Sequence, residues 1–364
     1  MEGNYSSVLI TLNSFYLGIP NKQDTLSINL KELSVIIVNY NSVQDILNCI
    51  KSCFKFSSAN SMEWLIVNND LTGKGKEEII AQFPSVRWIE MGYNAGYARA
   101  NNKGINESSG DIVLLLNPDT LIEDDAIEKC FKRLKDSGYV AAAAQLKNPD
   151  GSPQITGNFI IRGGLNHLLP LPYLGSFLRK IAFAIGTKKT NIPLASKEEK
   201  ADWINGAFLM VKKSTIKKAG LLDEDFFLYS EEAEWCSRLK KYGEMCVYGD
   251  LSVIHLQGES IGRSTRQHGK GYFELTGKKG LQLIISQHLR IRKQFGKGWF
   301  LFHLLVHAIE IPVYFIVSFF ENLFTFRNPF KDWGKALSYS KNILMLWNLS
   351  PKIWKNEPYF YKMF

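Results

Sequence analysis

Short apolar runs of strand length alternate with segments of helical spacing along the chain from about residue 33 to residue 145. The expected strands lie at 34–38, 64–67, 86–89, 111–116 and 140–145. The segments between them carry apolar residues at every third or fourth position, as on the buried face of a helix. These expected helices lie at 43–56, 74–82, 96–107 and about 123–136. The alternation predicts βαβ units and therefore an α/β fold, with a mostly parallel central sheet flanked by helices.

The pattern changes after residue 150. Residues 151–200 contain the pair Gly163-Gly164 and several prolines, so we expect an insertion or a mobile loop, with a basic helix near 177–190. Regular structure should resume at 203–255. Residues 1–30 show no pattern that predicts an element. We therefore divide the sequence into an N-terminal extension (1–30), an α/β domain (31–270) and a C-terminal region (271–364).

The C-terminal region is basic and rich in aromatic residues. Residues 271–364 contain 13 Lys and Arg against 5 Asp and Glu, so they carry +8 of the total charge of +9. Within them, 299–326 is strongly apolar, but its longest stretch without charge or histidine, Ile311–Phe320, is about half of the ~20 residues that span a bilayer. This predicts helices that lie in a membrane interface. The alternative is a helical pair buried against the main domain.

Composition excludes several classes of protein. A hydrophobic content of 45% with 22% charged residues is that of a globular chain. The first residues lack the pattern of a signal peptide, and the five cysteines are odd in number and scattered, so we expect a cytoplasmic protein with reduced, buried thiols. The basic charge could attract nucleic acid, but no nucleic-acid motif accompanies it, so we expect no such partner. Association into homo-oligomers is left open.

Polar side chains follow three of the expected strands. Asn39, Tyr40 and Asn41 follow the first strand, Asn68 to Asp70 follow the second, and Asn117-Pro118-Asp119 follow the fourth. The carboxyl ends of parallel strands meet at one edge of the sheet, where α/β proteins bind ligands. Amides there can recognise a base and a ribose, and the carboxylate of Asp119 suits a divalent cation that carries a diphosphate. The alternative is that these residues only form turns.

A stretch rich in small residues begins the expected helix at 96–107. It reads YNAGYARANNKG, and it contains Asn94, Gly96 and Arg99. Small residues permit close approach to a ligand, and helix N-termini favour phosphate. The alternative is tight packing of the helix on the sheet, with Arg99 in solvent.

Two further segments carry residues suited to chemistry. An aromatic run is followed by Glu231 and Glu232. A carboxylate beside a second carboxylate has a raised proton affinity. A raised proton affinity suits a general base that takes the proton of a sugar hydroxyl. The alternative is a favourable interaction with a helix dipole. His255 ends an apolar strand and is a candidate metal or phosphate ligand, although a structural histidine is the more common case. Arg263 and Arg266 follow it and could neutralise a diphosphate.

The order of these motifs resembles that of the family 2 inverting glycosyltransferases with a GT-A fold, in particular bacterial rhamnosyltransferase-like members. The resemblance covers about residues 33–265. It is carried by VIIVNYNS, NAGYARANNKG, LLLNPDT, WINGAFLMVKK, DEDFFLYSEEAEWCSRLKKYG and HLQGES. The family's paired acidic residues that bind metal fall on Asn117-Pro118-Asp119, where only the last carboxylate is kept. Its acidic contact to the base falls on Asn68, and its Glu-Asp base motif reads Glu231-Glu232.

The resemblance implies roles for particular residues. It implies that Glu232, next to Glu231, is the general base, and that Asp119 and His255 hold Mg²⁺ or Mn²⁺. Around them it implies contacts to the nucleotide sugar from Asn39, Tyr40, Asn41, Asn68, Asp70, Asn94, Gly96, Arg99, Asn117, Trp203, Asn205, Gly206 and Arg263.

The implied function is transfer of a sugar with inversion, by a single displacement. L-Rhamnose or another deoxysugar from a dTDP or UDP donor is expected to pass to a saccharide or lipid-linked saccharide in cell-surface polysaccharide synthesis. The C-terminal region would hold the enzyme at the inner face of the cell membrane. Two alternatives stay open. One is a sugar-phosphate nucleotidyltransferase, although the Gly-rich basic loop of such enzymes is missing after the first strand. The other is a non-enzymatic, basic membrane-binding protein.

Overall fold

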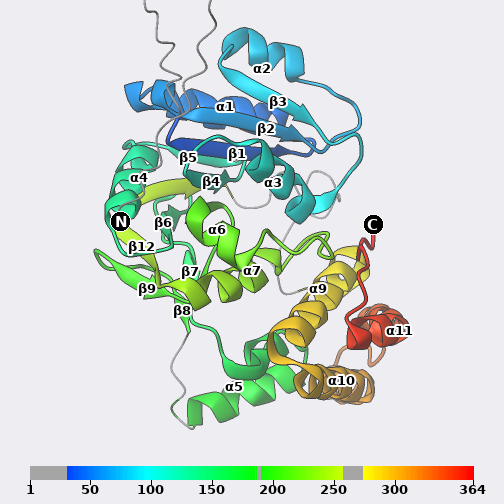
Figure 1. Ribbon diagram of the computed structural model, residues 1–364. Helices are drawn as coiled ribbons and strands as arrows, with labels where there is room; N and C mark the ends of the chain where they lie inside the picture. Colours follow the sequence, from blue (N-terminus) through cyan, green and yellow to red (C-terminus); the bar gives the residue numbers. More distant parts are fainter. Residues whose placement is uncertain (1–30, 185, 187–189, 257–273) are drawn as a thin grey trace, which may run out of the picture. The chain divides into compact units, whose positions relative to one another are not determined.

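The computed structural model describes residues 31–184, 186, 190–256 and 274–364, and from Lys31 onward these form one compact unit (Figure 1). The C-terminal helices belong to this unit. The boundary expected near residue 270 is therefore a change in sequence pattern, and packing continues across it.

A nine-stranded sheet forms the centre of this unit. Its order is β3 (Val86–Glu90), β2 (Glu63–Asn68), β1 (Leu33–Asn39), β4 (Ile112–Leu116), β11 (Phe208–Lys212), β6 (Ala141–Lys147), β12 (Met245–His255) and β5 (Thr120–Ile122), with β9 (Glu199–Ala201) also paired to β12. The adjacent strands β3, β2, β1 and β4 are parallel to one another, and β6 is parallel to β12. Strand β11 is antiparallel to both β4 and β6, and β5 and β9 are antiparallel to β12. The predicted mostly parallel sheet is confirmed.

The first five predicted strands and the helices between them are present. The helices are α1 (Val43–Cys53), α2 (Lys76–Gln82), α3 (Gly96–Glu107) and α4 (Ala126–Asp136), and a short 3₁₀ turn covers Ser57–Ser61. Every residue of β4 is buried, because helices cover both faces of the sheet. Helix α4 begins three residues later than expected, since Thr120–Ile122 pairs with β12 as β5. Strands this short show no periodicity in a sequence. All five cysteines are buried and free, as predicted.

Residues 151–200, expected as an insertion or a loop, contain regular elements. Strands β7 (Gly157–Asn158) and β8 (Asn191–Ile192) join β10 (Trp203–Ile204) in a small second sheet. A 3₁₀ segment at Arg162–Leu168 precedes α5 (Leu174–Ala184), which is the expected basic helix. The Gly163 position requires glycine, because φ is +70° and a Cβ there would lie 2.3 Å from the Trp299 ring.

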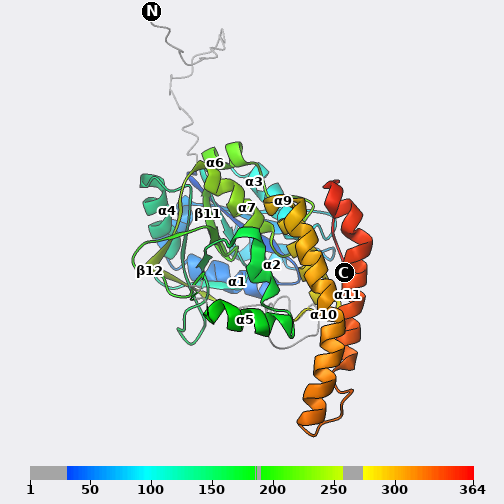
Figure 2. The same ribbon diagram turned by 90° about the horizontal axis from the view of Figure 1, so that it is seen from below.

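The rest of the chain is mainly helical. Helices α6 (Lys213–Ala219) and α7 (Glu231–Leu239), followed by a 3₁₀ turn at Lys240–Tyr242, precede β12, and α9 (Gly277–Phe295), α10 (Lys297–Phe324) and α11 (Trp333–Lys355) follow it. Figure 2 shows α10 and α11 lying alongside each other. Helices α9, α10 and α11 form a second apolar core together with residues from the middle of the chain. This core contains Ile284 of α9 and Tyr339 of α11, and also Leu168 and Phe226.

Helix α10 buries polar as well as apolar side chains, and it exposes many large apolar ones. His303, His307 and Glu310 are buried on its inner face. Large apolar side chains are exposed on its other face, at Phe302, Leu305, Ile309, Ile316, Phe320 and Phe324. By length and composition, it is the one helix in the described ranges that could cross a membrane. The outer face of α10 therefore presents a row of exposed apolar side chains.

Candidate active site

The ends of β1 and β2 are joined by two buried amides. Asn39 Nδ2 donates to Asn68 Oδ1 over 2.8 Å, and Asn68 Nδ2 donates to Glu90 Oε2 over 2.7 Å. Neither amide is exposed to solvent. A direct contact between these two residues and a nucleotide, predicted from the sequence, would therefore require the strand ends to open. Their contacts in the structure hold the ends of the two strands together.

The side chains beyond these amides are more accessible. Tyr40 is 39% exposed, Asn41 is exposed with φ of +54°, and Asp70 is half-buried. The Asp70 carboxylate accepts hydrogen bonds from the backbone N–H and the hydroxyl of Thr72, at 3.1 and 2.9 Å. These three residues therefore form the accessible part of the predicted nucleotide site at this edge of the sheet.

The structure brings the two predicted metal ligands together. Asp119 follows β4 and His255 ends β12, and the distance between Asp119 Oδ1 and His255 Nε2 is 3.4 Å. Asn117 Nδ2 also lies 3.4 Å from that nitrogen. The pairing of β12 with β5 brings the two loops into contact, since Leu256 N donates to Asp119 O. Asp119 and His255 are 3% and 5% exposed, so any ion between them would be largely shielded from water.

This pair of side chains suits a hard or borderline divalent cation. Carboxylate oxygen and imidazole nitrogen are both ligands for Mn²⁺-type ions. Within the described ranges, no cluster of three or more His, Cys, Asp or Glu residues could hold a metal alone. A cation bound by Asp119 and His255 would therefore take further ligands from outside these side chains.

Glu231 and Glu232 begin α7 after an unusual turn. Tyr229 and Ser230 both have positive φ, 72° and 68°, which non-glycine residues adopt at a cost of about 1–3 kcal/mol in sites where strain is retained. Glu231 is buried, and its Oε2 has no hydrogen-bond partner among the described residues. Glu232 is half-buried. The turn therefore directs the first carboxylate inward and leaves the second partly accessible.

The environments of the two carboxylates differ. Burial, and then the charge of Glu232, raise the pKa of Glu231 well above its ordinary value. Burial also raises the pKa of Glu232, and the nearby charge of Arg290 opposes that rise. Of the two carboxyls, Glu232 is therefore the one that is more readily ionised.

Arg290 was not predicted as a site residue. It lies on α9, only 7% exposed, and its guanidinium donates to Gln294 Oε1 over 2.9 Å and to His167 Nε2 over 3.0 Å. Burial lowers its pKa to about 10, with Glu232 opposing the change. The signal available was its spacing from Leu283, a residue seven positions earlier on the same face of the helix.

Residues 203–207 connect the two halves of the site. Asn117 N donates to Ala207 O over 3.0 Å, so this segment touches the loop that carries Asp119. At Gly206, a Cβ would lie 3.6 Å from Glu232 Cγ and 2.9 Å from the Tyr97 hydroxyl, which donates to Gly206 O. The predicted residues Trp203, Asn205 and Gly206 therefore lie between the carboxylate pair and the Asp119 loop. Asn205 itself is held by the backbone of 155–156.

The small residues at the start of α3 permit tight packing of that helix. Gly96 has φ of +74°, and a Cβ there would lie 2.3 Å from Phe227 O, so glycine permits close packing against the turn before Glu231. Asn94 Oδ1 accepts from Gly96 N over 3.2 Å. Arg99 donates to Glu224 O and lies 3.8 Å from the centre of the Phe360 ring. A phosphate contact for Arg99 would require it to leave these partners. Arg263 lies outside the described residues.

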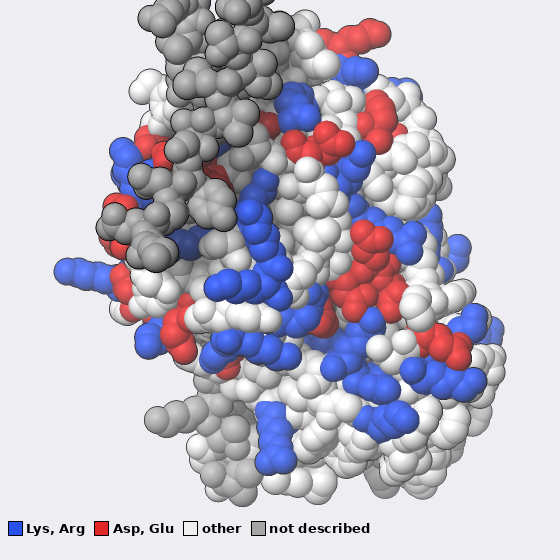
Figure 3. Space-filling model, viewed as in Figure 1, with Lys and Arg blue, Asp and Glu red and all other residues white. Residues whose placement is uncertain are grey.

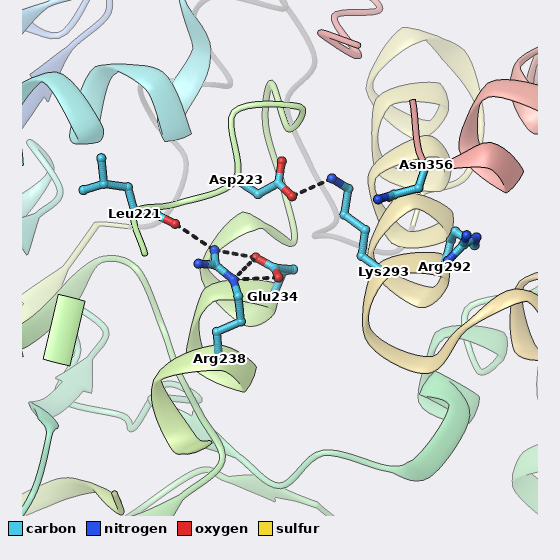
Figure 4. Close-up of a pocket in the computed structure, with 7 residues that line it drawn as sticks. All are labelled: Leu221, Asp223, Glu234, Arg238, Arg292, Lys293 and Asn356. Atoms are coloured by element: carbon cyan, nitrogen blue, oxygen red, sulfur yellow. Dashed lines mark hydrogen bonds and ion pairs between the residues drawn. The ribbon is translucent and has the colours of Figure 1, made fainter. Parts of the chain in front are cut away.

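A separate charged hollow lies between α7 and α9. Figure 4 shows its lining residues, and its volume is about 350 Å³. Arg238 pairs with Glu234, and Lys293 donates to Asp223 over 2.5 Å. These four side chains therefore form ion pairs with each other, and none of the predicted site residues lines the hollow.

Comparisons with known proteins agree with the fold and with the order of motifs. Residues 34–186 match the model of glycosyl transferase family 2. The chain is 28% identical to a low-salt glycan biosynthesis hexosyltransferase of Haloferax volcanii over 58% of its length, and it covers 62% of that protein. It is 26% identical to an N-acetylglucosaminyl-diphospho-decaprenol L-rhamnosyltransferase of Mycobacterium tuberculosis, covering 65% of this chain and 80% of the relative.

One solved structure shows the same fold. The chain superposes on GalNAc-T7, crystallised with UDP, GalNAc and Mn²⁺, with a TM-score of 0.51 and 12% identity over 71% of this chain and 49% of that one. This likeness shows that the chain has a GT-A fold. Residues 34–186 thus resemble glycosyl transferase family 2, and the chain is similar to rhamnosyltransferases of Mycobacterium tuberculosis and Escherichia coli.

Proposed function

We propose that this glycosyltransferase moves a deoxysugar, with L-rhamnose the first candidate, from a dTDP or UDP donor to a saccharide or lipid-linked saccharide, with inversion. The observation that carries the proposal is the convergence of Asp119, His255 and Glu232 around residues 203–207. Support for the sugar and the lipid-linked acceptor comes from the name of the Mycobacterium tuberculosis relative, which describes both.

Glu232 accepts the proton of the acceptor hydroxyl as that oxygen attacks the anomeric carbon. It is suited to this role because it is partly accessible and its charge is supported by Arg290. Glu231 keeps its proton and leaves the neighbouring carboxylate as the base. Because one face of the sugar is attacked as the diphosphate leaves from the other, a single step inverts the anomeric centre.

Asp119 and His255 would hold Mg²⁺ or Mn²⁺, with the donor diphosphate and water completing the coordination. The bound cation would stabilise the negative charge that develops on the leaving diphosphate. The two side chains fit such an ion because both point into one shielded position. Tyr40, Asn41 and Asp70 are the accessible groups for the nucleoside.

The outer face of α10 would rest on a lipid surface that carries the acceptor. Helix α5 is attached to α10, because Glu310 accepts hydrogen bonds from Tyr173 N and Leu174 N at 2.8 and 3.0 Å. The surface over α5 and α10 is mainly white in Figure 3, with several blue basic side chains. An apolar face with nearby cations suits a membrane of anionic lipid. We propose a peripheral position on the cytoplasmic side.

A panel of nucleotide sugars tests the proposal. Donor binding is measured by thermal shift with and without Mn²⁺, and transfer is measured as release of nucleoside diphosphate in the presence of a lipid-linked saccharide. We expect the largest Mn²⁺-dependent shift with dTDP-rhamnose or a related deoxysugar donor. Release of pyrophosphate from a nucleoside triphosphate and a sugar phosphate would instead favour a nucleotidyltransferase. Absence of any nucleotide binding would favour a non-enzymatic, membrane-binding protein.

A further inference from the structure

Gln154 connects the loop after β6 to the end of β12. Its side chain is 4% exposed, and its Nε2 donates to His255 O over 2.6 Å and to Asn148 Oδ1 over 2.7 Å. Its backbone N–H is fixed as well, by Leu146 O at 2.9 Å. A glutamine at this place, seven residues after β6 in an N-P-D-G-S-P-Q turn, gave no signal in the sequence.

These bonds determine which end of the amide faces the imidazole. Both partners of Nε2 are oxygens that accept, so the amide nitrogen must face them and Oε1 must face the histidine ring. His255 Nδ1 lies 3.0 Å from that Oε1. An amide oxygen only accepts hydrogen bonds, so Nδ1 carries the proton. In the neutral ring, Nε2 is then left with its lone pair, on the side of Asn117 and Asp119.

The other neutral tautomer would be costly at this position. With the proton on Nε2, the bare Nδ1 would face the bare Oε1 of Gln154 at 3.0 Å. Rotating the amide to relieve that contact would turn its oxygen toward His255 O and Asn148 Oδ1, and both hydrogen bonds would be lost. Leaving buried polar groups unpaired costs about 1–3 kcal/mol each. The tautomer of His255 is therefore coupled to the whole hydrogen-bond set of Gln154.

We infer that Gln154 is a positioning residue for a divalent cation, holding His255 in the tautomer whose Nε2 can bind metal beside Asp119. The inference rests on the proposed function. Histidines that bind metals generally donate the other ring N–H to a fixed acceptor, and loss of that acceptor costs about 10–100-fold in metal affinity. Gln154 supplies such an acceptor without adding a negative charge.

Two variants of the full-length protein and two measurements test this role. Gln154→Leu removes the acceptor, whereas Gln154→Glu keeps an acceptor for the Nδ1 proton. The first measurement is the tautomer of His255 in metal-free protein, from ¹⁵N NMR of the labelled histidines. The second is the affinity for Mn²⁺ alone, by electron paramagnetic resonance titration. We expect Nδ1-protonated His255 in the wild type and in Gln154→Glu, and Mn²⁺ binding by Gln154→Leu about 10–100-fold weaker than by Gln154→Glu. The Gln154→Glu variant is the reference for this comparison because it keeps the acceptor for Nδ1 but, like Gln154→Leu, lacks the amide donor to His255 O and Asn148 Oδ1.

Matched controls separate positioning from general damage. Gln282 is also a fully buried amide with several hydrogen bonds, and the bonds join it to Ser286, Tyr361 and Met363, so Gln282→Leu should leave the tautomer and the Mn²⁺ affinity unchanged in the folded protein. An Nε2-protonated His255 in the wild type overturns the inference, and needs no variant. Equal loss of Mn²⁺ affinity in Gln154→Leu and Gln154→Glu also overturns it.

The inference and the proposed metal site can fail separately. If Asp119→Asn lowers Mn²⁺ affinity but Gln154→Leu does not, only the role of Gln154 is wrong. If neither Asp119→Asn nor His255→Ala changes Mn²⁺ binding, the proposed metal site is wrong, and the role of Gln154 falls with it.

Discussion

At the scale of single residues, the charge of a buried arginine controls the proposed base. Arg290 lies near Glu232 but makes its hydrogen bonds to Gln294 and His167. Because it acts on Glu232 through its charge and not through contact with a substrate, its removal should change the pH dependence of transfer more than donor binding.

Replacement of Arg290 by glutamine is expected to move the acid limb of the rate profile to higher pH. Glu232 must be ionised to accept a proton, and its pKa rises further when the opposing positive charge is lost. Activity is therefore lost first at low pH and recovers as pH rises. The measurement is kcat against pH, in which the apparent value belongs to the Glu231–Glu232 pair.

Arg290→Lys, which keeps the charge, should restore most of the wild-type profile. Arg292→Gln is the matched control, because Arg292 lies two residues further on, on the opposite side of α9, and donates to Trp354 O at the surface. If Arg290→Gln transfers sugar and the acid limb of its kcat profile lies at the same pH as in the wild type, Arg290 does not lower the pKa of the base.

Sequence reasoning predicted where polar residues follow the strands, but it did not predict the contacts that these residues make. The ends of β4 and β12 were expected to carry Asp119 and His255, because polar residues at the ends of buried strands are visible in a sequence. That Asn39 and Asn68 bond to each other depends on strand register, which the sequence did not define. Gln154 and Arg290 act across 101 and 58 positions, and contacts at such separation leave no local pattern.

At the scale of elements, a buried glutamate attaches α5 to α10. Glu310 interrupts an apolar helix, and the sequence suggested only that it shortened a membrane-spanning stretch. In the structure its carboxylate accepts the N–H groups of Tyr173 and Leu174, which the start of α5 would otherwise leave unpaired. This contact explains a polar residue on the inner face of α10.

Glu310→Ala should lower the free energy of unfolding by about 1–3 kcal/mol for each backbone group left unpaired, and should increase hydrogen exchange in α5 before the rest of the protein. Chemical denaturation and hydrogen exchange measure the two effects. The control is Glu321→Gln, because Glu321 accepts from the hydroxyl of the same Tyr173 but is exposed, so its loss should have little effect. Unchanged exchange in α5 of Glu310→Ala would contradict this account of the attachment.

At the scale of the whole molecule, the C-terminal helices pack against the part of the chain that carries the proposed base. Helix α9 carries Arg290, and residues from the turn before α7 lie in the same apolar core as α9 and α11. Removing residues 271–364 would expose that core and take away the cation near Glu232. The sequence separated these regions by composition, whereas packing joins them.

Single substitutions on the outer face of α10 are therefore the better test of membrane contact. Ile309→Asp or Phe320→Asp should weaken binding to phosphatidylglycerol vesicles by about tenfold or more, because a large apolar side chain contributes roughly 1.5–3 kcal/mol when buried. Leu71→Asp is the control, since Leu71 is 75% exposed on the loop after β2. Co-sedimentation at low and high salt measures both the apolar and the electrostatic part.

Equal vesicle binding by Ile309→Asp and the wild type would argue against this surface. A wild-type dimer in solution that Ile309→Asp dissociates, without vesicle binding by either protein, would assign the face to a second copy of the chain.

The most direct test of the proposed chemistry is the rate of sugar transfer by Glu232→Gln, measured with its affinity for the donor. The variant keeps the size and most hydrogen bonds of the side chain but cannot take a proton at neutral pH. We expect transfer to fall by about 10²–10⁴-fold while the donor Kd in the presence of Mn²⁺ stays close to that of the wild type. Transfer by Glu232→Gln at the wild-type rate would contradict the account.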